Sequence, residues 1–277
     1  MKIIVAVLDW GLGHASRSIP IIKNFLEEKH EVILASSGDA MQLLQKEFST
    51  LEMIILPPYE VSYHKDSFVL SIFQQLPKIK KTIYKENDII AHWVDKINPD
   101  LIFSDNRYGC YHRKVRSILM THQLKPLVPK SLFFLKPFVP LLFKSFYKNF
   151  NEFWVPDFAA EPSLSSVLSH DSPELNPKFI GPSSRFHYEN PPEKYTFKLT
   201  VILSGPEPQR SNLEKILRKQ LLAFPYESVL VRGVMEEADP IEIGRLTIYN
   251  YMLSEQLEEQ IYNSELVLSR SGYSTIM

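Results

Sequence analysis

The chain opens with Ile3-Ile4-Val5-Ala6-Val7-Leu8-Asp9-Trp10-Gly11-Leu12-Gly13-His14, a stretch that decides the fold class. Its first six residues form a short apolar run rich in β-branched side chains. Such a run is typical of a strand that is buried on both faces of a parallel sheet. Two glycines follow where the strand would turn into a helix. We therefore predict that the chain begins with a strand, a glycine-containing turn and a helix.

The same alternation of apolar runs and helix-like stretches continues along the chain and predicts an α/β fold. A proline-rich stretch, residues 181–192, interrupts it, and it begins again at Leu199. We predict two Rossmann-like domains, residues 1–190 and 191–277. The expected strands are 3–8, 31–35, 53–56, 101–104, 117–121, 199–203, 229–232, 246–249 and 266–268. The expected helices include 40–48, 68–97 (bent or broken near Pro77), 212–222 and 255–262.

The composition excludes several classes of protein. Hydrophobic residues make up 44% of the 277 residues and charged residues 23%, which is typical of a globular chain and not of a disordered one. The net charge of −1 argues against a nucleic-acid binder. A single cysteine, Cys110, allows no intrachain disulfide and no cysteine-rich zinc site, and we interpret it as a buried small residue. No apolar run reaches the ~18 residues of a membrane span. We expect a cytoplasmic protein.

The Gly11–Gly13 pair does not complete a dinucleotide-binding fingerprint. That fingerprint has a third glycine where Ser16 stands, and an acidic residue at the end of the second strand. This sequence reads Ala35-Ser36-Ser37 there, and it contains no GxxxxGK[ST] motif. NAD binding and a P-loop nucleotide site are therefore both disfavoured.

His14 places an imidazole at the edge of the sheet where ligands bind in open parallel sheets. A neutral imidazole can take a proton from a hydroxyl near pH 7, and a carboxylate can orient it. Asp105, at the end of another strand of the same predicted sheet, can supply that carboxylate. The alternative is that His14 caps a helix and Asp105 closes a turn. His122 stands at a third strand end, where a plain hydrogen-bonding role is the alternative.

The second domain has its own glycine-containing turn. The sequence Ser269-Arg270-Ser271-Gly272-Tyr273-Ser274-Thr275 combines small hydroxyls with a glycine at a strand-to-helix junction. Backbone N–H groups at such a junction can hold a diphosphate without a metal. The alternative is an ordinary capped turn.

Several motifs together resemble GT-B-fold glycosyltransferases of the family 28 kind, which include the enzyme that adds N-acetylglucosamine to the lipid-linked peptidoglycan precursor. The resemblance is strongest to uncharacterised bacterial glycosyltransferases and covers essentially the whole chain. The motifs that carry it, in order, are GLGHASRS (11–18), SDNRYG (104–109), THQL (121–124), SGPEPQR (204–210) and SRSGYSTIM (269–277).

The resemblance implies transfer of a sugar from a nucleotide donor, UDP-linked by expectation, to an acceptor hydroxyl with inversion at the anomeric carbon. It implies no metal and no cofactor beyond the nucleotide-sugar co-substrate. His14 would be the general base or an acceptor contact, with Asp105 as its orienter. Gly11, Gly13, Asn106 and His122 would line the acceptor side. The donor side would comprise Ser204, Gly205, Arg210, Arg270, Ser271, Gly272, Ser274 and Thr275.

One departure from the family pattern concerns the end of the chain. In the family, an acidic residue that binds the donor ribose lies six positions beyond the glycine of the last motif, which from Gly272 is one past Met277. Further elements of the donor domain should follow. We expect the second domain to be incomplete at Met277, and a chain ending there to bind donor weakly and catalyse little.

A basic, acid-free stretch raises the question of a membrane surface. No Asp or Glu occurs between Asp105 and Glu152, and lysines alternate with aromatic and aliphatic residues from Lys125 to Lys148. This pattern fits a helix on an anionic membrane surface, which would suit a glycolipid or cell-envelope glycan as the acceptor. The alternative is a helix whose apolar face packs internally and whose lysines are solvated. Pro137 and Pro140 count against one continuous surface helix.

Two other functions remain open. A UDP-sugar epimerase on the same fold would turn over nucleotide-sugar with no acceptor present. A non-catalytic protein that binds a nucleotide-sugar or a lipid head group would not depend on His14.

Overall fold

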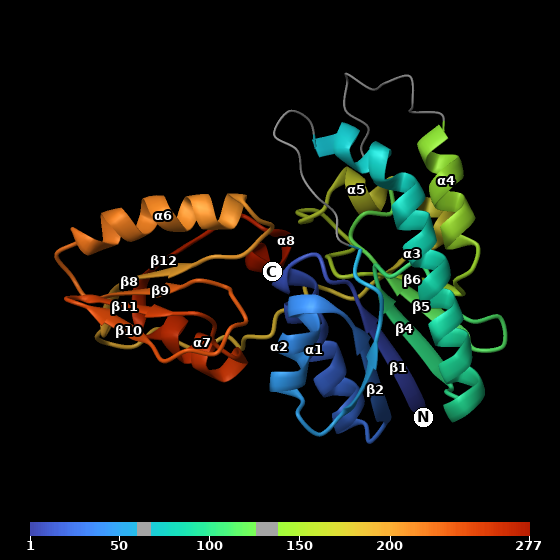
Figure 1. Cartoon of the computed structure of the whole chain (residues 1–277), viewed down its shortest axis with the longest axis horizontal. Coiled ribbons are helices and arrows are strands. Elements are labelled where there is room, and N and C mark those ends of the chain that lie inside the picture. The colour runs from blue at the N-terminus through green and yellow to red at the C-terminus, as the bar shows by residue number, and fades with distance from the viewer. Residues whose placement is uncertain (60–67, 126–137) are drawn as a thin grey trace. The chain divides into compact units, whose positions relative to one another are not determined.

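The computed structural model describes residues 1–59, 68–125 and 138–277, without the side chains of 68–74 and 138–142. The chain forms two compact units, each containing one sheet (Figure 1). Unit 1 comprises Met1–Asp9, Ile21–Gly38 and Thr50–Ser183, and unit 2 comprises Trp10–Pro20, Asp39–Ser49 and Ser184–Met277. The predicted α/β fold class is confirmed, while the division at residues 190 and 191 stays a prediction.

The sheet of unit 1 has seven strands in the order β3-β2-β1-β4-β5-β6-β7. Every neighbouring pair is parallel, as predicted. The strands are β1 (Lys2–Val7), β2 (Glu31–Ser36), β3 (Glu52–Ile55), β4 (Leu101–Asp105), β5 (Arg116–Met120), β6 (Glu152–Val155) and β7 (Lys178–Phe179). The first five match the predicted runs. The last two were not predicted, because each is only a few residues long and lies in a stretch with many polar residues.

The helices of unit 1 lie on both faces of this sheet. They are α1 (Leu12–Glu27, shared with unit 2), α3 (Phe68–Ile97), α4 (Phe138–Tyr147) and α5 (Val167–His170), with a 3-10 turn, η2 (Pro173–Leu175). Ile90 and Val94 of α3 pack against one face, which includes Ile102 of β4. Phe25 of α1 packs edge-on against Phe103, whose side chain points to the other face because successive strand residues alternate. Of the bend or break expected near Pro77, the break is wrong, since α3 is one helix that contains this proline, and the bend stays a prediction.

The sheet of unit 2 has five strands in the order β10-β11-β9-β8-β12. They are β8 (Phe197–Ile202), β9 (Ser228–Val231), β10 (Ile241–Ile243), β11 (Leu246–Tyr249) and β12 (Ser264–Ser269). Strand β10 was not predicted and pairs antiparallel with β11, so this sheet is not wholly parallel. Gly244, at φ +62°, supplies the left-handed residue that a tight hairpin turn needs.

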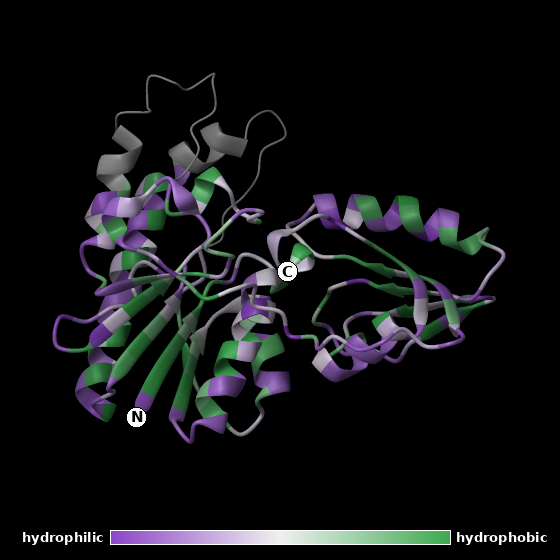
Figure 2. Cartoon of the chain, turned by 180° about the vertical axis from the view of Figure 1, so that it is seen from behind, coloured by the Kyte–Doolittle hydropathy of each residue, from purple (hydrophilic) through white to green (hydrophobic). Residues whose placement is uncertain are grey.

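Two helices cover opposite faces of the unit 2 sheet, and two others also belong to this unit. Leu221 of α6 (Gln209–Leu222) packs with Val201, and Leu257 of α7 (Ser254–Tyr262) packs with Val229 and Val231 on the other face. The remaining helices are α2 (Gly38–Glu47) and the single turn α8 (Tyr273–Ile276). Figure 2 shows hydrophobic colour concentrated along the strands, while the helices carry stripes of both kinds. This is the burial pattern that the alternating sequence predicts.

The described part of the basic stretch packs inward. Phe143, Phe146 and Tyr147 of α4 surround the ring of Tyr108, with centroids 6.0, 5.3 and 6.3 Å away. Lys144 and Lys148 are exposed. This arrangement corresponds to the alternative of an internally packed helix with solvated lysines. Residues 126–137 of the stretch lie outside the described residues. Within the described ranges, no helix is both long enough and apolar enough to cross a membrane.

Candidate functional site

The carboxyl ends of the unit 1 strands bring several polar residues to one edge of the sheet. Val7 is level with Asp105 in the next strand, and Asp105 is level with Met120 in the one after. The residues that follow these strands therefore lie along the same edge, where open parallel sheets bind ligands. Asn106 and His122 both belong to this group, as predicted from their positions after strands.

A buried arginine that the sequence did not single out ties this edge together. The Arg107 side chain is wholly buried, and its Nε donates to the Val7 carbonyl at 2.8 Å. Its Nη1 donates to Glu86 Oε1 at 2.8 Å and to the Pro57 carbonyl at 3.0 Å, and its Nη2 donates to Ser37 Oγ at 2.5 Å. Arg107 thus joins the ends of β1, β2 and β3 to helix α3.

Asp9, one residue beyond the buried opening run, is the second carboxylate at Arg107. Its Oδ1 lies 3.4 Å from Arg107 Nη2, and its Oδ2 accepts from Ser37 Oγ at 2.8 Å. The Asp9 side chain is 7% exposed. One guanidinium therefore compensates two buried carboxylates, which fixes Asp9 in place just before the glycine turn.

Glu86 is the most deeply buried acid of the cluster. It accepts from the Tyr59 hydroxyl at 2.9 Å and from the Gly109 backbone N–H at 3.1 Å. Burial raises the pKa of the Glu86 carboxyl above its usual value, and the Arg107 charge opposes that rise without cancelling it. Burial, and then the Glu86 charge, raise the pKa of the Tyr59 phenol well above its usual value. These groups hold the edge of the sheet together and are closed to solvent.

Asn106 has the geometry of a ligand contact. It follows β4 in the left-handed region at φ +56°, with its backbone N–H donating to the Met120 carbonyl at 3.2 Å. Its Oδ1 is buried and accepts no hydrogen bond from any of the described residues. A buried acceptor without a donor is unfavourable unless a ligand supplies one. This agrees with the predicted role of Asn106 on the acceptor side, which stays a prediction.

His14 is the third residue of α1 and is partly exposed. Its Nδ1 lies 2.9 Å from Nη2 of Arg17. Because a guanidinium has only donors, Nδ1 must be the acceptor, and a neutral His14 then carries its proton on Nε2. A role as general base through Nδ1 requires Arg17 to release this nitrogen. Gly11, at φ +75°, gives the turn before α1 a conformation that side chains rarely adopt.

His14 belongs to unit 2 and Asp105 to unit 1, so the proposed pairing of the two stays a prediction. Asp105 ends β4 with its side chain wholly buried. Its backbone carbonyl accepts from the Leu8 N–H at 3.1 Å. His122 is partly exposed and follows Thr121, whose hydroxyl caps the turn by accepting from the Gln123 N–H at 3.0 Å.

In unit 2, three of the predicted donor-side residues lie together at the carboxyl edge of the sheet. Arg270 follows β12, and its Nη1 donates to the Ser204 carbonyl at 3.1 Å. Gly205 is at φ +111°, and a Cβ built on it would lie 2.2 Å from Arg270 Nη1. The absence of a side chain at Gly205 therefore lets the Arg270 guanidinium cover the loop after β8.

Arg210 is occupied by carboxylates. Its side chain is 9% exposed and forms ion pairs with Glu207 and Glu214, each at 2.6 Å. It also donates to Ser211 Oγ at 2.9 Å and to the Arg232 carbonyl at 3.2 Å. A phosphate at Arg210 would have to compete with both carboxylates, so its predicted role as a phosphate contact gains no support from these partners.

The last motif forms a tight turn that ends in α8. The Gly272 N–H donates to the Arg270 carbonyl at 2.8 Å, and the Thr275 N–H donates to the Gly272 carbonyl at 2.9 Å. Ser271 and Thr275 are exposed and Ser274 is partly exposed. Their predicted diphosphate contacts are thus compatible with the local structure and stay predictions.

The sequence did not single out Arg107, Glu86, Asp9, Glu214, Arg232 or Asn250. Asp9, Arg107 and Arg232 follow strands by one or two residues, and that position could have drawn attention to them. Glu86 and Glu214 lie within helices, where a polar residue is ordinarily solvated, and no sequence signal distinguishes them.

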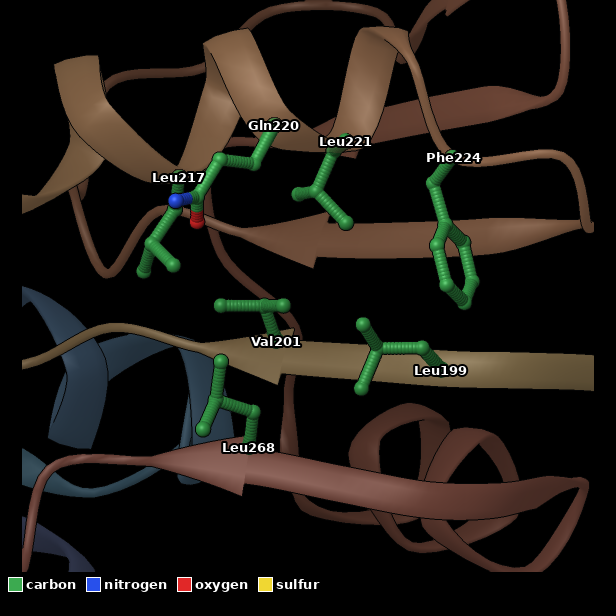
Figure 3. Close-up of a pocket in the computed structure, with 7 residues that line it drawn as sticks. All are labelled: Leu199, Val201, Leu217, Gln220, Leu221, Phe224 and Leu268. Carbon is green, nitrogen blue, oxygen red and sulfur yellow. The ribbon is translucent and has the colours of Figure 1, made fainter.

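An apolar cavity of about 170 Å³ in unit 2 lies apart from these polar residues. Figure 3 shows α6 side chains facing those of β8 and β12 across it. It is lined by Leu199, Val201, Leu217, Gln220, Leu221, Phe224 and Leu268. With a single polar side chain, it lacks the converging polar groups of a reaction site. Among the described residues, no three His, Cys, Asp or Glu side chains are grouped to hold a metal ion.

Comparison with known proteins shows the fold. No family profile matches the sequence. An uncharacterized glycosyltransferase of Methanosarcina mazei is 24% identical, covering all of this chain and 77% of that protein. The glycosyltransferase SsfS6 of Streptomyces sp. SF2575, solved with thymidine diphosphate, has a TM-score of 0.61 at 14% identity, over 100% of this chain and 78% of that one. A UDP-N-acetylglucosamine 2-epimerase, described as putative, of Listeria monocytogenes has a TM-score of 0.52 at 10% identity, over 99% and 75% of the two chains. The chain has the α/β fold of the GT-B glycosyltransferases.

Proposed function

We propose that this protein is a glycosyltransferase that moves a sugar from a nucleoside-diphosphate donor to an acceptor hydroxyl. The observation that carries the proposal is the open arginine, Arg270, seated over Gly205 at the carboxyl edge of the unit 2 sheet. A guanidinium at that edge suits a phosphate, and the relatives that align along the whole chain are named glycosyltransferases. UDP is the expected nucleotide, and thymidine diphosphate is the alternative because SsfS6 was solved with it.

The acceptor would lie against unit 1, where Asn106 Oδ1, which accepts no hydrogen bond from the described residues, would accept one from a substrate hydroxyl. His14 would act on the acceptor hydroxyl, either as a hydrogen-bonding contact or, once Arg17 releases Nδ1, as the general base. A glycolipid or cell-envelope glycan is the proposed acceptor, because the sequence motifs resemble those of family 28. Peripheral attachment at the cytoplasmic face of the membrane through Lys125–Lys148 belongs to the same proposal.

The proposed reaction inverts the configuration at the anomeric carbon of the transferred sugar. The acceptor oxygen forms a bond to that carbon while the bond to the diphosphate oxygen breaks, and the hydroxyl proton passes to His14. The departing diphosphate carries away the electron pair and gains negative charge. Arg270 and the backbone N–H groups of Ser271 and Ser274 would stabilise this charge without a divalent metal.

Release of nucleoside diphosphate, measured with and without acceptor, tests the proposal. The full chain is supplied with UDP- and TDP-sugars and a panel of glycolipid and glycan acceptors. A transferase releases UDP or TDP only when an acceptor is present. The Listeria match favours an epimerase as the second candidate, which would interconvert the donor sugar with no acceptor.

The variant His14→Ala separates catalysis from mere binding. We expect it to lower the transfer rate about 10²-fold, since it removes a group that handles a proton in the transition state. Lys23→Ala, a change further along the same helix, is the matched control and should transfer at the wild-type rate. Undiminished transfer by His14→Ala would refute the role given to this residue.

A further inference from the structure

Arg232, in the turn after β9, has the features of a fixed anion ligand. Its backbone N–H donates to the Tyr249 carbonyl at 2.9 Å. The next residue, Gly233, is at φ +69°, and a Cβ built on it would lie 2.2 Å from the Leu203 carbonyl oxygen. The glycine therefore lets this turn lie directly against the end of β8, beside the Ser204–Gly205 loop.

Two side chains hold the Arg232 guanidinium. Its Nε donates to Glu214 Oε1 at 2.7 Å, and its Nη1 donates to Asn250 Oδ1 at 2.7 Å. The side chain stays 29% exposed, and Nη2 donates to none of the described residues. Arg232 is thus oriented by the protein, while its Nη2 group is available to a ligand.

The distribution of charge distinguishes Arg232 from Arg210. Arg210 has two carboxylates, Glu207 and Glu214, and is almost fully buried. Arg232 shares only Glu214, through the oxygen that Arg210 does not use. Positive charge at this edge is therefore available from Arg232 and not from Arg210.

The order of the strands places Arg232 beside the predicted phosphate loop. Strand β8 lies between β9 and β12, so Arg232 and Arg270 follow the two neighbours of the strand that leads to Ser204 and Gly205. Two open guanidinium groups on either side of one glycine loop suit a group with several anionic oxygens, such as a diphosphate.

We propose that Arg232 binds a phosphate of the nucleoside diphosphate, and that Arg210 is a positioning residue that acts through Glu214. This rests on the proposed function and moves the phosphate contact from Arg210 to Arg232. The proposal distinguishes a group that touches the ligand from one that only orients its neighbour.

Calorimetric titration of the full chain with UDP and uridine, and with TDP and thymidine, tests the proposal. Arg232→Met should bind the diphosphate roughly 10- to 100-fold more weakly and the nucleoside as well as the wild type does, because only the phosphate contact is lost. Arg232→Lys should bind the diphosphate with an affinity between those of the wild type and Arg232→Met, since lysine keeps the positive charge but lacks the planar set of donors of a guanidinium. Arg245→Met, at the opposite edge of the same sheet, is the matched control and should bind UDP normally.

The positioning role of Arg210 has its own readout. Arg210→Met should weaken diphosphate binding. Adding Arg232→Met to this variant should lower the diphosphate affinity by a smaller factor than Arg232→Met does in the wild type, because the two residues act through one contact. Independent effects that simply add would contradict a role through Glu214.

The outcomes separate this inference from the proposed function. Equal weakening of UDP and uridine by Arg232→Met would assign it a merely structural role and overturn the inference. Wild-type affinity in Arg232→Met would also overturn it, with the nucleotide-binding proposal intact. A wild-type chain that binds neither UDP nor TDP would overturn both.

Discussion

The carboxyl edges of the two sheets are both organised by arginines, but they do so in opposite ways. In unit 1, Arg107 is wholly buried and faces two buried carboxylates, Asp9 and Glu86. In unit 2, Arg232 is 29% exposed and shares the single carboxylate of Glu214. An arginine side chain therefore closes the carboxyl edge of the unit 1 sheet, whereas another arginine leaves the carboxyl edge of the unit 2 sheet open. The number of carboxylates and the degree of burial decide whether an arginine serves the fold or remains available to a ligand.

The largest effect is expected at the closed edge. Arg107→Met leaves Glu86 and Asp9 buried without their cation, which should lower the free energy of unfolding by about 3–5 kcal/mol. Urea unfolding followed by circular dichroism measures this. Adding Glu86→Gln should recover part of the loss, because one of the two unpaired charges is then removed. An Arg107→Met variant with the unfolding free energy of the wild type would contradict the contrast between the two edges.

A smaller effect is expected from the glycine that seats Arg232. Gly233→Ala places a methyl group against the Leu203 carbonyl and should cost about 3 kcal/mol of unfolding free energy. Gly244→Ala is the matched control, with a similar φ of +62° and no atom within 4 Å of the added Cβ. It should cost only about 1 kcal/mol. Equal costs for the two variants would mean that the turn after β9 is free to move away from β8.

The smallest effect is expected at an ion-pair group away from both edges. Glu152 accepts from Lys178 at 2.6 Å and also pairs with Arg116. The Lys178 hydrogen bond, with help from Arg116, holds the pKa of Glu152 at about 2. Both cations are more than half exposed, so Glu152→Gln should cost only about 1 kcal/mol at pH 7.

The direction of the pH dependence follows from that lowered pKa. A carboxylate whose pKa is lower in the folded state stabilises the fold above its ordinary pKa of 4.5. This stabilisation is lost as the pH falls from about 4.5 to about 2. The stability difference between wild type and Glu152→Gln should therefore shrink over this interval when unfolding is followed at successive pH values. A difference that stays constant would contradict the assignment.

The strands with continuous apolar runs could be predicted from sequence, because burial on both faces requires such runs. The runs at 3–8 and 246–249 correspond closely to β1 and β11. Strands β7 and β10 span only two and three residues, too few for a recognisable run, and β6 has three apolar residues but was not recognised. The break allowed for at Pro77 does not occur, because the packing of a long helix can outweigh the loss of one backbone hydrogen bond.

The candidate site was predictable only where it depends on local sequence. The Gly205 loop and Arg270 follow strands, and the motif that contains each could be recognised. The carboxylates Glu86 and Glu214, which pair with Arg107 and Arg210, could not, because both lie within helices and Glu86 is 21 residues away from Arg107 along the chain. Whether an arginine is closed or open depends on those partners, so sequence alone favoured Arg210 over Arg232.

Hydrogen–deuterium exchange with and without UDP tests most directly the claim that the open arginine edge holds the donor. The account predicts slower exchange in peptides that contain Ser204–Gly205, Arg232–Gly233 and Arg270–Ser274. Peptides around Arg107 should exchange at the same rate with and without the nucleotide. Slower exchange around Arg107, with no change at those three segments of unit 2, would contradict the account.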